Sequence, residues 1–175
     1  AQNGYRIVMH GAAGHTLNRV YTEQVLEYLD YPICYTDNEV ETQLQQRHFA
    51  YIPLDAFAPI LSDLISLRNV MGLRSPIQAA FQLGYKNSAV IKGEGGEFER
   101  NPDAKTLICG IKNGELYEHE LPKLTPDRSP TEEELDLESF KQIWLGQQNH
   151  DYGELAVTET IGIALYTMGE AQNFE

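Results

Sequence analysis

Hydrophobic and polar positions along the chain follow two periods, one typical of strands and one typical of helices. The segment "YRIVMH" (5–10) is an apolar run rich in β-branched residues that ends at "GAAG", which predicts a strand followed by a loop. From 19 to 29 the apolar side chains recur at helical spacing, and Tyr31-Pro32 ends that run. The beginning of the chain is therefore expected to form a strand, a loop and a helix.

Helix-capping residues, turn residues and hydrophobic periodicity predict where the later helices and strands begin and end. Helices are expected over about 36–46, over 55–67 with Asp55 as its cap, over 75–84, from 131 onwards, and over 153–168. The short run "SAVIKG" (88–93) barely alternates, which is typical of a central strand. Asn113-Gly114 lies between two β-prone runs and predicts a hairpin within 106–121. Strands interleaved with helices predict an α/β domain whose mixed sheet is flanked by helices.

Size and composition favour a single domain over 1–175. A chain of 175 residues with 42% hydrophobic composition can bury a substantial core. No run approaches the roughly 18 apolar residues that span a bilayer, and the N-terminus lacks the order of a secretory signal, so we expect a cytoplasmic protein without a membrane partner. Cys34 and Cys109 lack metal-ligand spacing and are expected to be buried thiols rather than a disulfide or a zinc site.

The charge balance restricts the partners. The chain has 26 acidic and 13 basic residues, and its formal net charge is −13. This charge repels nucleic acid and anionic membranes unless Lys and Arg gather on one face. The balance favours a soluble enzyme or a protein-binding role.

The segment "KGEGGEFERN" (92–101) is the first candidate site. A strand that ends in a glycine loop places backbone N–H groups at the carboxyl edge of a sheet, where open α/β folds bind ligands. The candidate anion-binding residues are Gly93, Gly95 and Gly96, and the candidate Mg²⁺ ligands are Glu94, Glu97 and Glu99. The alternative is a polar reversal in which the glycines permit positive φ and the glutamates face water.

Two further segments carry candidate binding residues. "MHGAAGHT" (9–16) places small residues after a strand, which lets a phosphate approach the backbone beside Gly11, with His10 and His15 as donors. Two histidines without a third ligand do not indicate zinc. Arg74 in "MGLRSP" follows a helix and precedes a Ser-Pro cap, so it can clamp a carboxylate or phosphate, or lie over the preceding helix.

These segments occur in an order that resembles a known family. "RIVMHGAAGHT", "EQVLEYLD", "YIPLDAFAPILSDLISLRNVMGLRSP", "AVIKGEGGEFERNP" and "NGELYEHELPKL" together resemble the anthranilate phosphoribosyltransferase family, in particular its divergent glycosyltransferase-family branch. The resemblance covers nearly the whole chain, and its specific parts are "GLRSP", "VIKGEGGEFERNP" and "DYGELAV". It implies a large α/β domain of the nucleoside phosphorylase and phosphoribosyltransferase type, with part of a small helical domain for which 36–70 is the candidate.

The resemblance also implies a ligand and an assembly. In that family phosphoribosyl pyrophosphate with Mg²⁺ lies across the sheet edge, an amine acceptor attacks the anomeric carbon and pyrophosphate leaves. Members typically form homodimers through the helical part. Relative to the family, an N-terminal helical portion and a loop near 76–77 are absent from this chain, and we expect the chain to join pieces at that loop.

The family's functional residues are only partly kept. Its Lys-His-Gly-Asn-Arg signature falls on 9–13, where only His10 and Gly11 match, and its acceptor-side arginine matches Arg74. Its metal-binding Asp-Glu pair falls on Phe98 and Glu99, so one ligand is lost unless Glu94 or Glu97 replaces it. The family's earlier glycine-rich phosphate loop has no counterpart here, so ordinary anthranilate activity is not expected.

The sequence therefore leaves two hypotheses. The first is a phosphoribosyltransferase-like glycosyltransferase-family protein that binds a phosphorylated ribose, or another small anion, and whose acceptor is unknown. The second is a binding module of the same fold without catalysis, with a protein or a nucleic acid as partner. Because the chain is acidic, nucleic acid would have to bind through residues outside this sequence.

Overall fold

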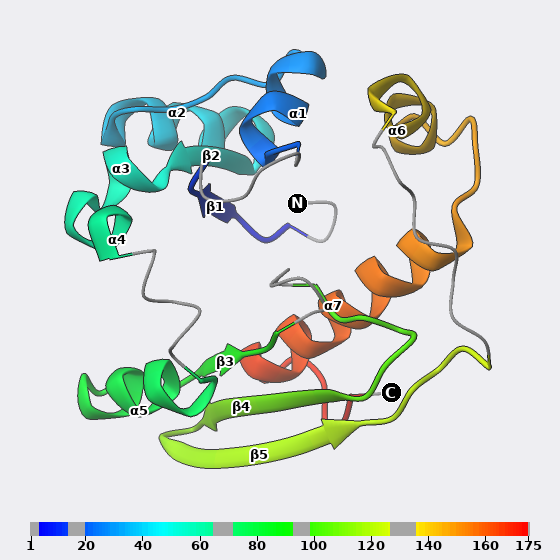
Figure 1. The fold of residues 1–175 in the computed structure, drawn as a ribbon. Coiled ribbons are helices and arrows are strands. Elements are labelled where there is room, and N and C mark those ends of the chain that lie inside the picture. Colours follow the sequence, from blue (N-terminus) through cyan, green and yellow to red (C-terminus); the bar gives the residue numbers. More distant parts are fainter. Residues whose placement is uncertain (1–3, 14–19, 65–71, 93–98, 127–135, 175) are drawn as a thin grey trace. The chain divides into compact units, whose positions relative to one another are not determined.

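The computed structural model describes residues 4–13, 20–64, 72–92, 99–126 and 136–174. These residues belong to two compact units (Figure 1), and each is treated by itself. The first unit comprises Ala1–Asn69 and Glu134–Trp144, and the second comprises Val70–Glu133 and Leu145–Glu175. Within the described ranges the chain forms seven helices and five strands. None of the helices in these ranges is both long and apolar enough to cross a membrane.

The first unit contains a pair of parallel strands. Strand β1 (Ile7–Gly11) pairs with β2 (Phe49–Pro53) in a register that runs from Ile7 opposite Phe49 to Gly11 opposite Pro53. Parallel pairing needs a long crossover, and helices α1 (Thr22–Tyr28) and α2 (Asp37–Arg47) lie in that connection. The other helices of this unit are α3 (Leu54–Phe57), α4 (Pro59–Leu64) and α6 (Leu137–Trp144).

The second unit contains an antiparallel sheet with a helix on each face (Figure 1). Its strands, in the order β3-β4-β5, are Ser88–Val90, Thr106–Lys112 and Glu115–Leu121. On one face Ile77 of α5 (Arg74–Gln82) packs with Cys109 and Ile111, and on the other Ile163 of α7 (Asp151–Met168) packs with Ile108. Successive residues of β4 point to opposite faces, so this one buried strand supplies both cores.

Several predicted elements are confirmed. The hairpin forms between β4 and β5, and its turn residues Asn113 and Gly114 have φ of 54° and 83°. Thr36 caps α2, accepting a hydrogen bond from the backbone of Glu39 at 3.4 Å. Helix α7 ends at Gly169 in the left-handed conformation, as expected. The start of the helix predicted from 131 lies outside the described residues, and α6 begins at Leu137 within that prediction.

The helix predicted over 55–67 is wrong in its detail. Two short helices, α3 and α4, occupy 54–64, and Asp55 lies in the first turn of α3 rather than at its cap. Ala58 separates them in an extended conformation, with φ −149° and ψ 77°. Pro59 explains the break, because a residue that precedes proline is excluded from the helical region.

The α/β class is confirmed, with parallel and antiparallel pairing both present. In the described residues they form two sheets, one in each unit, where a mixed sheet was expected. Helix α5 runs without interruption through 76 and 77, since a proline in the first helical turn removes no intrahelical hydrogen bond. Cys34 and Cys109 are free and buried, as predicted, and burial raises the pKa of both thiols.

Candidate functional site

The carboxyl edge of β1 and β2 brings two predicted residues together. His10 and Gly11 are the last residues of β1, opposite Ile52 and Pro53 at the end of β2. Parallel strands end at the same edge, and this is the edge at which open α/β folds bind ligands. The His10 ring stacks on Phe57 of α3, with centroids 5.3 Å apart and planes 18° apart, so the imidazole is held at this edge. His15 lies outside the described residues.

Gly11 has a closer neighbour than the sequence suggested. A Cβ atom on Gly11 would lie 3.1 Å from the hydroxyl of Tyr51, the central residue of β2. The missing side chain therefore accommodates the Tyr51 ring against the strand. Sequence reasoning did not identify Tyr51, because the contact depends on the strand register and the strands are separated by two helices.

The surroundings of Tyr51 are acidic. Its residue surface is 2% exposed, and burial together with the carboxylates of Glu23 and Asp55 raises its pKa to about 12. Tyr35 donates a hydrogen bond from its hydroxyl to Glu23 Oε1 at 3.3 Å, which holds that carboxylate in place. Asp55 Oδ1 accepts from the backbone N–H of Ala56 at 3.0 Å.

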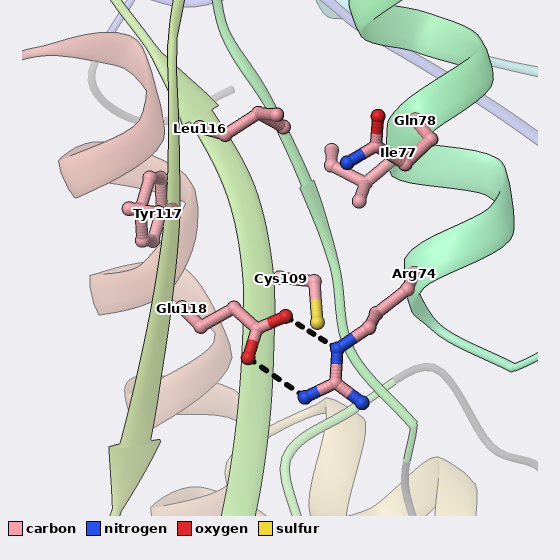
Figure 2. Close-up of a pocket in the computed structure, with 7 residues that line it drawn as sticks. All are labelled: Arg74, Ile77, Gln78, Cys109, Leu116, Tyr117 and Glu118. Carbon is pink, nitrogen blue, oxygen red and sulfur yellow. Dashed lines mark hydrogen bonds and ion pairs between the residues drawn. The ribbon is translucent and has the colours of Figure 1, made fainter.

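Arg74 is one of the residues that line a small pocket in the second unit (Figure 2). Its volume is about 150 Å³, and its lining comes from α5, β4 and β5: Arg74, Ile77, Gln78, Cys109, Leu116, Tyr117 and Glu118. Arg74 donates from Nε to Glu118 Oε1 at 2.6 Å and from Nη2 to Oε2 at 2.8 Å. The guanidinium thus forms a bidentate ion pair with a carboxylate of its own chain. A bound carboxylate or phosphate would be held in the same geometry.

Both members of this ion pair face solvent. The side chains of Arg74 and Glu118 are 68% and 46% exposed, so water screens their attraction and the pair contributes little to stability. The hydrogen bonds from Arg74 lower the pKa of Glu118, and the same contact raises the pKa of Arg74. Neither sequence interpretation of Arg74 anticipated Glu118, which lies 44 positions further along the chain.

The residues that follow the glycine-rich segment 93–96 are anchored inside the second unit. Gly93, Glu94, Gly95, Gly96 and Glu97 lie outside the described residues, and Glu99 is the first predicted metal ligand that the structure describes. Arg100 follows it and is fully buried. Its guanidinium donates to the carboxylate of Glu159 in α7 and to the carbonyl oxygen of Pro122. Its backbone N–H donates to Thr160 Oγ1 at 3.0 Å.

Asn101 adds a second anchor between the same segments. It is 7% exposed, and its Oδ1 accepts from the backbone of Asp103 at 2.8 Å and from the Tyr152 hydroxyl at 3.3 Å. The segments "ERNP" and "DYGEL" therefore pack against each other. Sequence reasoning assigned no role to Arg100, although an arginine followed by Asn-Pro within an acidic turn was the available signal.

No metal centre is assembled by the residues that the structure describes. Among them, His, Cys, Asp and Glu side chains nowhere gather in a group of three or more that could hold a metal ion. Glu99 is described without its predicted companions, so the Mg²⁺ site at Glu94, Glu97 and Glu99 stays a prediction.

The predicted site residues belong to both units. His10 and Gly11 lie in the first, and Arg74 and Glu99 lie in the second. The structure thus defines a mixed α/β protein with a parallel strand pair in one unit and a small pocket in the other. Comparison with known proteins finds no family model that matches the chain and no similar sequence among curated proteins.

Proposed function

We propose that this chain is a phosphoribosyltransferase-like protein of the glycosyltransferase family that binds a phosphorylated ribose, such as phosphoribosyl pyrophosphate, at the carboxyl edge of β1 and β2. One observation carries the proposal: His10 and Gly11 end β1 in register with the end of the parallel strand β2. The small residues Ala12 and Ala13 follow directly, so backbone N–H groups there can approach a phosphate closely. The proposed fold is the phosphoribosyltransferase-like large domain, with a homodimer as its assembly.

The side chains at the edge suit a binding and positioning role. Because the His10 ring is stacked on Phe57, its N–H can be directed at a phosphate oxygen without a large loss of side-chain freedom. Glu94, Glu97 and Glu99 would hold Mg²⁺, the ion that the resembled family uses together with phosphoribosyl pyrophosphate. Arg74, in the second unit, would bind an anionic group of a ligand, and the acceptor of the sugar is unknown.

Thermal unfolding in the presence of ligand tests the proposal. Phosphoribosyl pyrophosphate, ribose 5-phosphate and inorganic pyrophosphate are each added at millimolar concentration, with and without Mg²⁺. A ligand that binds only the folded state at 100 times its Kd stabilises it by about 2.7 kcal/mol. We expect a rise in the unfolding temperature with the phosphoribosyl ligands, and the absence of any rise would refute the proposal.

A pair of histidine variants locates the binding to the edge. His10→Asn removes the stacked imidazole and is expected to reduce the shift produced by phosphoribosyl ligands. His48→Asn is the matched control, because His48 precedes the opposite end of β2. His48 has φ 58°, a conformation that Asn adopts readily, so this control should keep both the fold and the ligand response.

A further inference from the structure

The turn of the β4–β5 hairpin contains an asparagine followed by a glycine, Asn113-Gly114. Asparagine is a thermolabile residue, and a following glycine has no side chain to hinder its deamidation. In that reaction the backbone nitrogen of Gly114 loses its proton to a base from the solvent and attacks the side-chain carbonyl carbon of Asn113. The bond from that carbon to the side-chain nitrogen breaks, and ammonia leaves. Water then opens the cyclic imide to aspartate or isoaspartate.

The side chain that would be attacked is open to water. Asn113 is exposed, and within the described part of the chain its side-chain amide forms no hydrogen bond. Its backbone has φ 54°, the left-handed conformation that a two-residue hairpin turn requires. Nothing in the described surroundings of the Asn113 side chain therefore protects it from attack, and any protection has to act on the attacking nitrogen.

The attacking nitrogen is held by a hydrogen bond. The N–H of Gly114 donates to the carbonyl oxygen of Lys86 at 2.9 Å, and the N–H of Asn113 donates to Asn87 Oδ1 at 3.0 Å. The Lys86 side chain also covers the turn, because its Cδ lies 3.6 Å from the Cβ position of Gly114. The Gly114 nitrogen must leave its hydrogen bond before it can lose its proton and approach the side-chain carbon. We refer to Lys86 and Asn87 as the turn clamp.

Strand β3 positions the turn clamp. Lys86 and Asn87 directly precede β3, whose first residue, Ser88, pairs with Ile111 of β4, two residues before the turn. The clamp therefore stays on the turn as long as β3 is paired with β4. Because β3 has three residues and is an end strand of its sheet within the described ranges, its separation from β4 is a local opening that requires less free energy than global unfolding.

We propose that Asn113 is a deamidation site whose conversion to aspartate and isoaspartate is controlled by the turn clamp. The closed clamp blocks the attack by Gly114, and opening of β3 permits it. This proposal is independent of the proposed function. Isoaspartate carries the main chain through the side-chain carbon and lengthens the turn, so Lys112 and Glu115 could no longer pair across two residues. The clamp thus preserves the register of the hairpin over time.

The rate of deamidation at Asn113 in the folded protein tests the proposal. The wild type is incubated at mildly alkaline pH, and digested samples are followed by mass spectrometry over time. A synthetic peptide with the sequence of 110–117 in the same buffer gives the rate without the clamp. We expect Asn113 to convert at least about tenfold more slowly in the protein than in the peptide, because the hydrogen bonds of the clamp must open first.

Two variants of Asn87 test the clamp itself. Asn87→Ala removes the acceptor of the Asn113 N–H, and we expect conversion of Asn113 about fivefold faster than in the wild type, since one neutral hydrogen bond is lost. Asn87→Asp keeps an acceptor oxygen at the same position, so it is the matched control and should convert at the wild-type rate. Neither change alters 110–117, so the same peptide is the reference for all three proteins.

Two results would overturn the proposal. If Asn113 converts as fast in the folded wild type as in the peptide, the clamp gives no protection, and this comparison does not depend on the folding of any variant. If the wild type is protected but Asn87→Ala is protected equally, the Asn87 side chain has no part in the control of the reaction.

Discussion

Substitution of Glu159 by Gln should destabilise the second unit, because its carboxylate balances a buried arginine. The side chain of Arg100 is 0% exposed and that of Glu159 is 24% exposed, and they form an ion pair between the segment that contains Arg100 and α7. Gln keeps the size of Glu159 and one acceptor oxygen but removes the negative charge. Burial already lowers the pKa of Arg100, and the charge of Glu159 opposes that effect.

The expected decrease in the free energy of unfolding follows from the exposed fractions of the Arg100 and Glu159 side chains. A buried charge left without its partner costs about 3–5 kcal/mol. Because Glu159 keeps contact with water and Gln can still accept a hydrogen bond, the expected decrease in the free energy of unfolding is about 2–3 kcal/mol. Urea unfolding at pH 7, followed by far-ultraviolet circular dichroism, measures it as a lower midpoint with an unchanged slope.

Glu120→Gln is the matched control. Glu120 Oε1 accepts from Lys105 Nζ at 2.7 Å, but these side chains are 56% and 69% exposed, so no measurable change is expected. If Glu159→Gln lowers the urea midpoint no more than Glu120→Gln does, the reasoning is wrong: the stability of the folded state would not depend on the charge of Glu159 beside the buried Arg100. Arg100→Met combined with Glu159→Leu removes both charges and should recover part of the stability that the single change loses.

Three further predictions concern the sheet of the second unit, and each is read from urea unfolding. Gly110→Ala should lower the free energy of unfolding by about 1–3 kcal/mol, because a Cβ there would lie 2.2 Å from the ring of Tyr117; an unchanged midpoint would show that the ring moves aside freely. Glu118→Gln should remove a contribution that depends on pH, since Arg74 lowers the pKa of Glu118 in the folded state. That contribution is complete well above pH 4.5, the ordinary carboxyl value, and is lost as the pH falls below it. Because the pair is exposed, the two proteins should differ only slightly at pH 7 and low ionic strength, where the bidentate geometry favours the pair, and should converge in acid. Asn113→Val should cost about 1–2 kcal/mol because Asn113 has φ 54°, whereas Asn113→Gly should be tolerated.

Features that depend on neighbouring residues could be predicted from the sequence. The Asn113-Gly114 turn needs positive φ at two successive positions, which these residues adopt at low cost, and the hairpin forms there. The cap at Thr36 depends on a group three residues away. The wrong prediction of one continuous helix over 55–67 also has a local cause. Ala58 is extended because Pro59 follows it, but the helical spacing of the apolar residues outweighed that signal in the prediction.

The candidate site depended on contacts between distant residues. Arg74 is a candidate anion clamp from its sequence context, but its observed partner, Glu118, is positioned by the register of β5 against β4. Arg100 lies in a segment that looks solvent-exposed in the sequence, and it is buried because α7 and Pro122 provide its acceptors. Tyr51 was missed because it becomes significant only when β1 and β2 pair in parallel.

The sequence by itself determined the α/β class, the hairpin, the Thr36 cap of α2 and the burial of both cysteines, because periodicity, turn chemistry and hydrophobicity act over a few residues. Only the tertiary structure decided which polar groups face one another. Such pairs are separated by tens of positions, and their energies depend on burial and on strand register, so no local pattern encodes them.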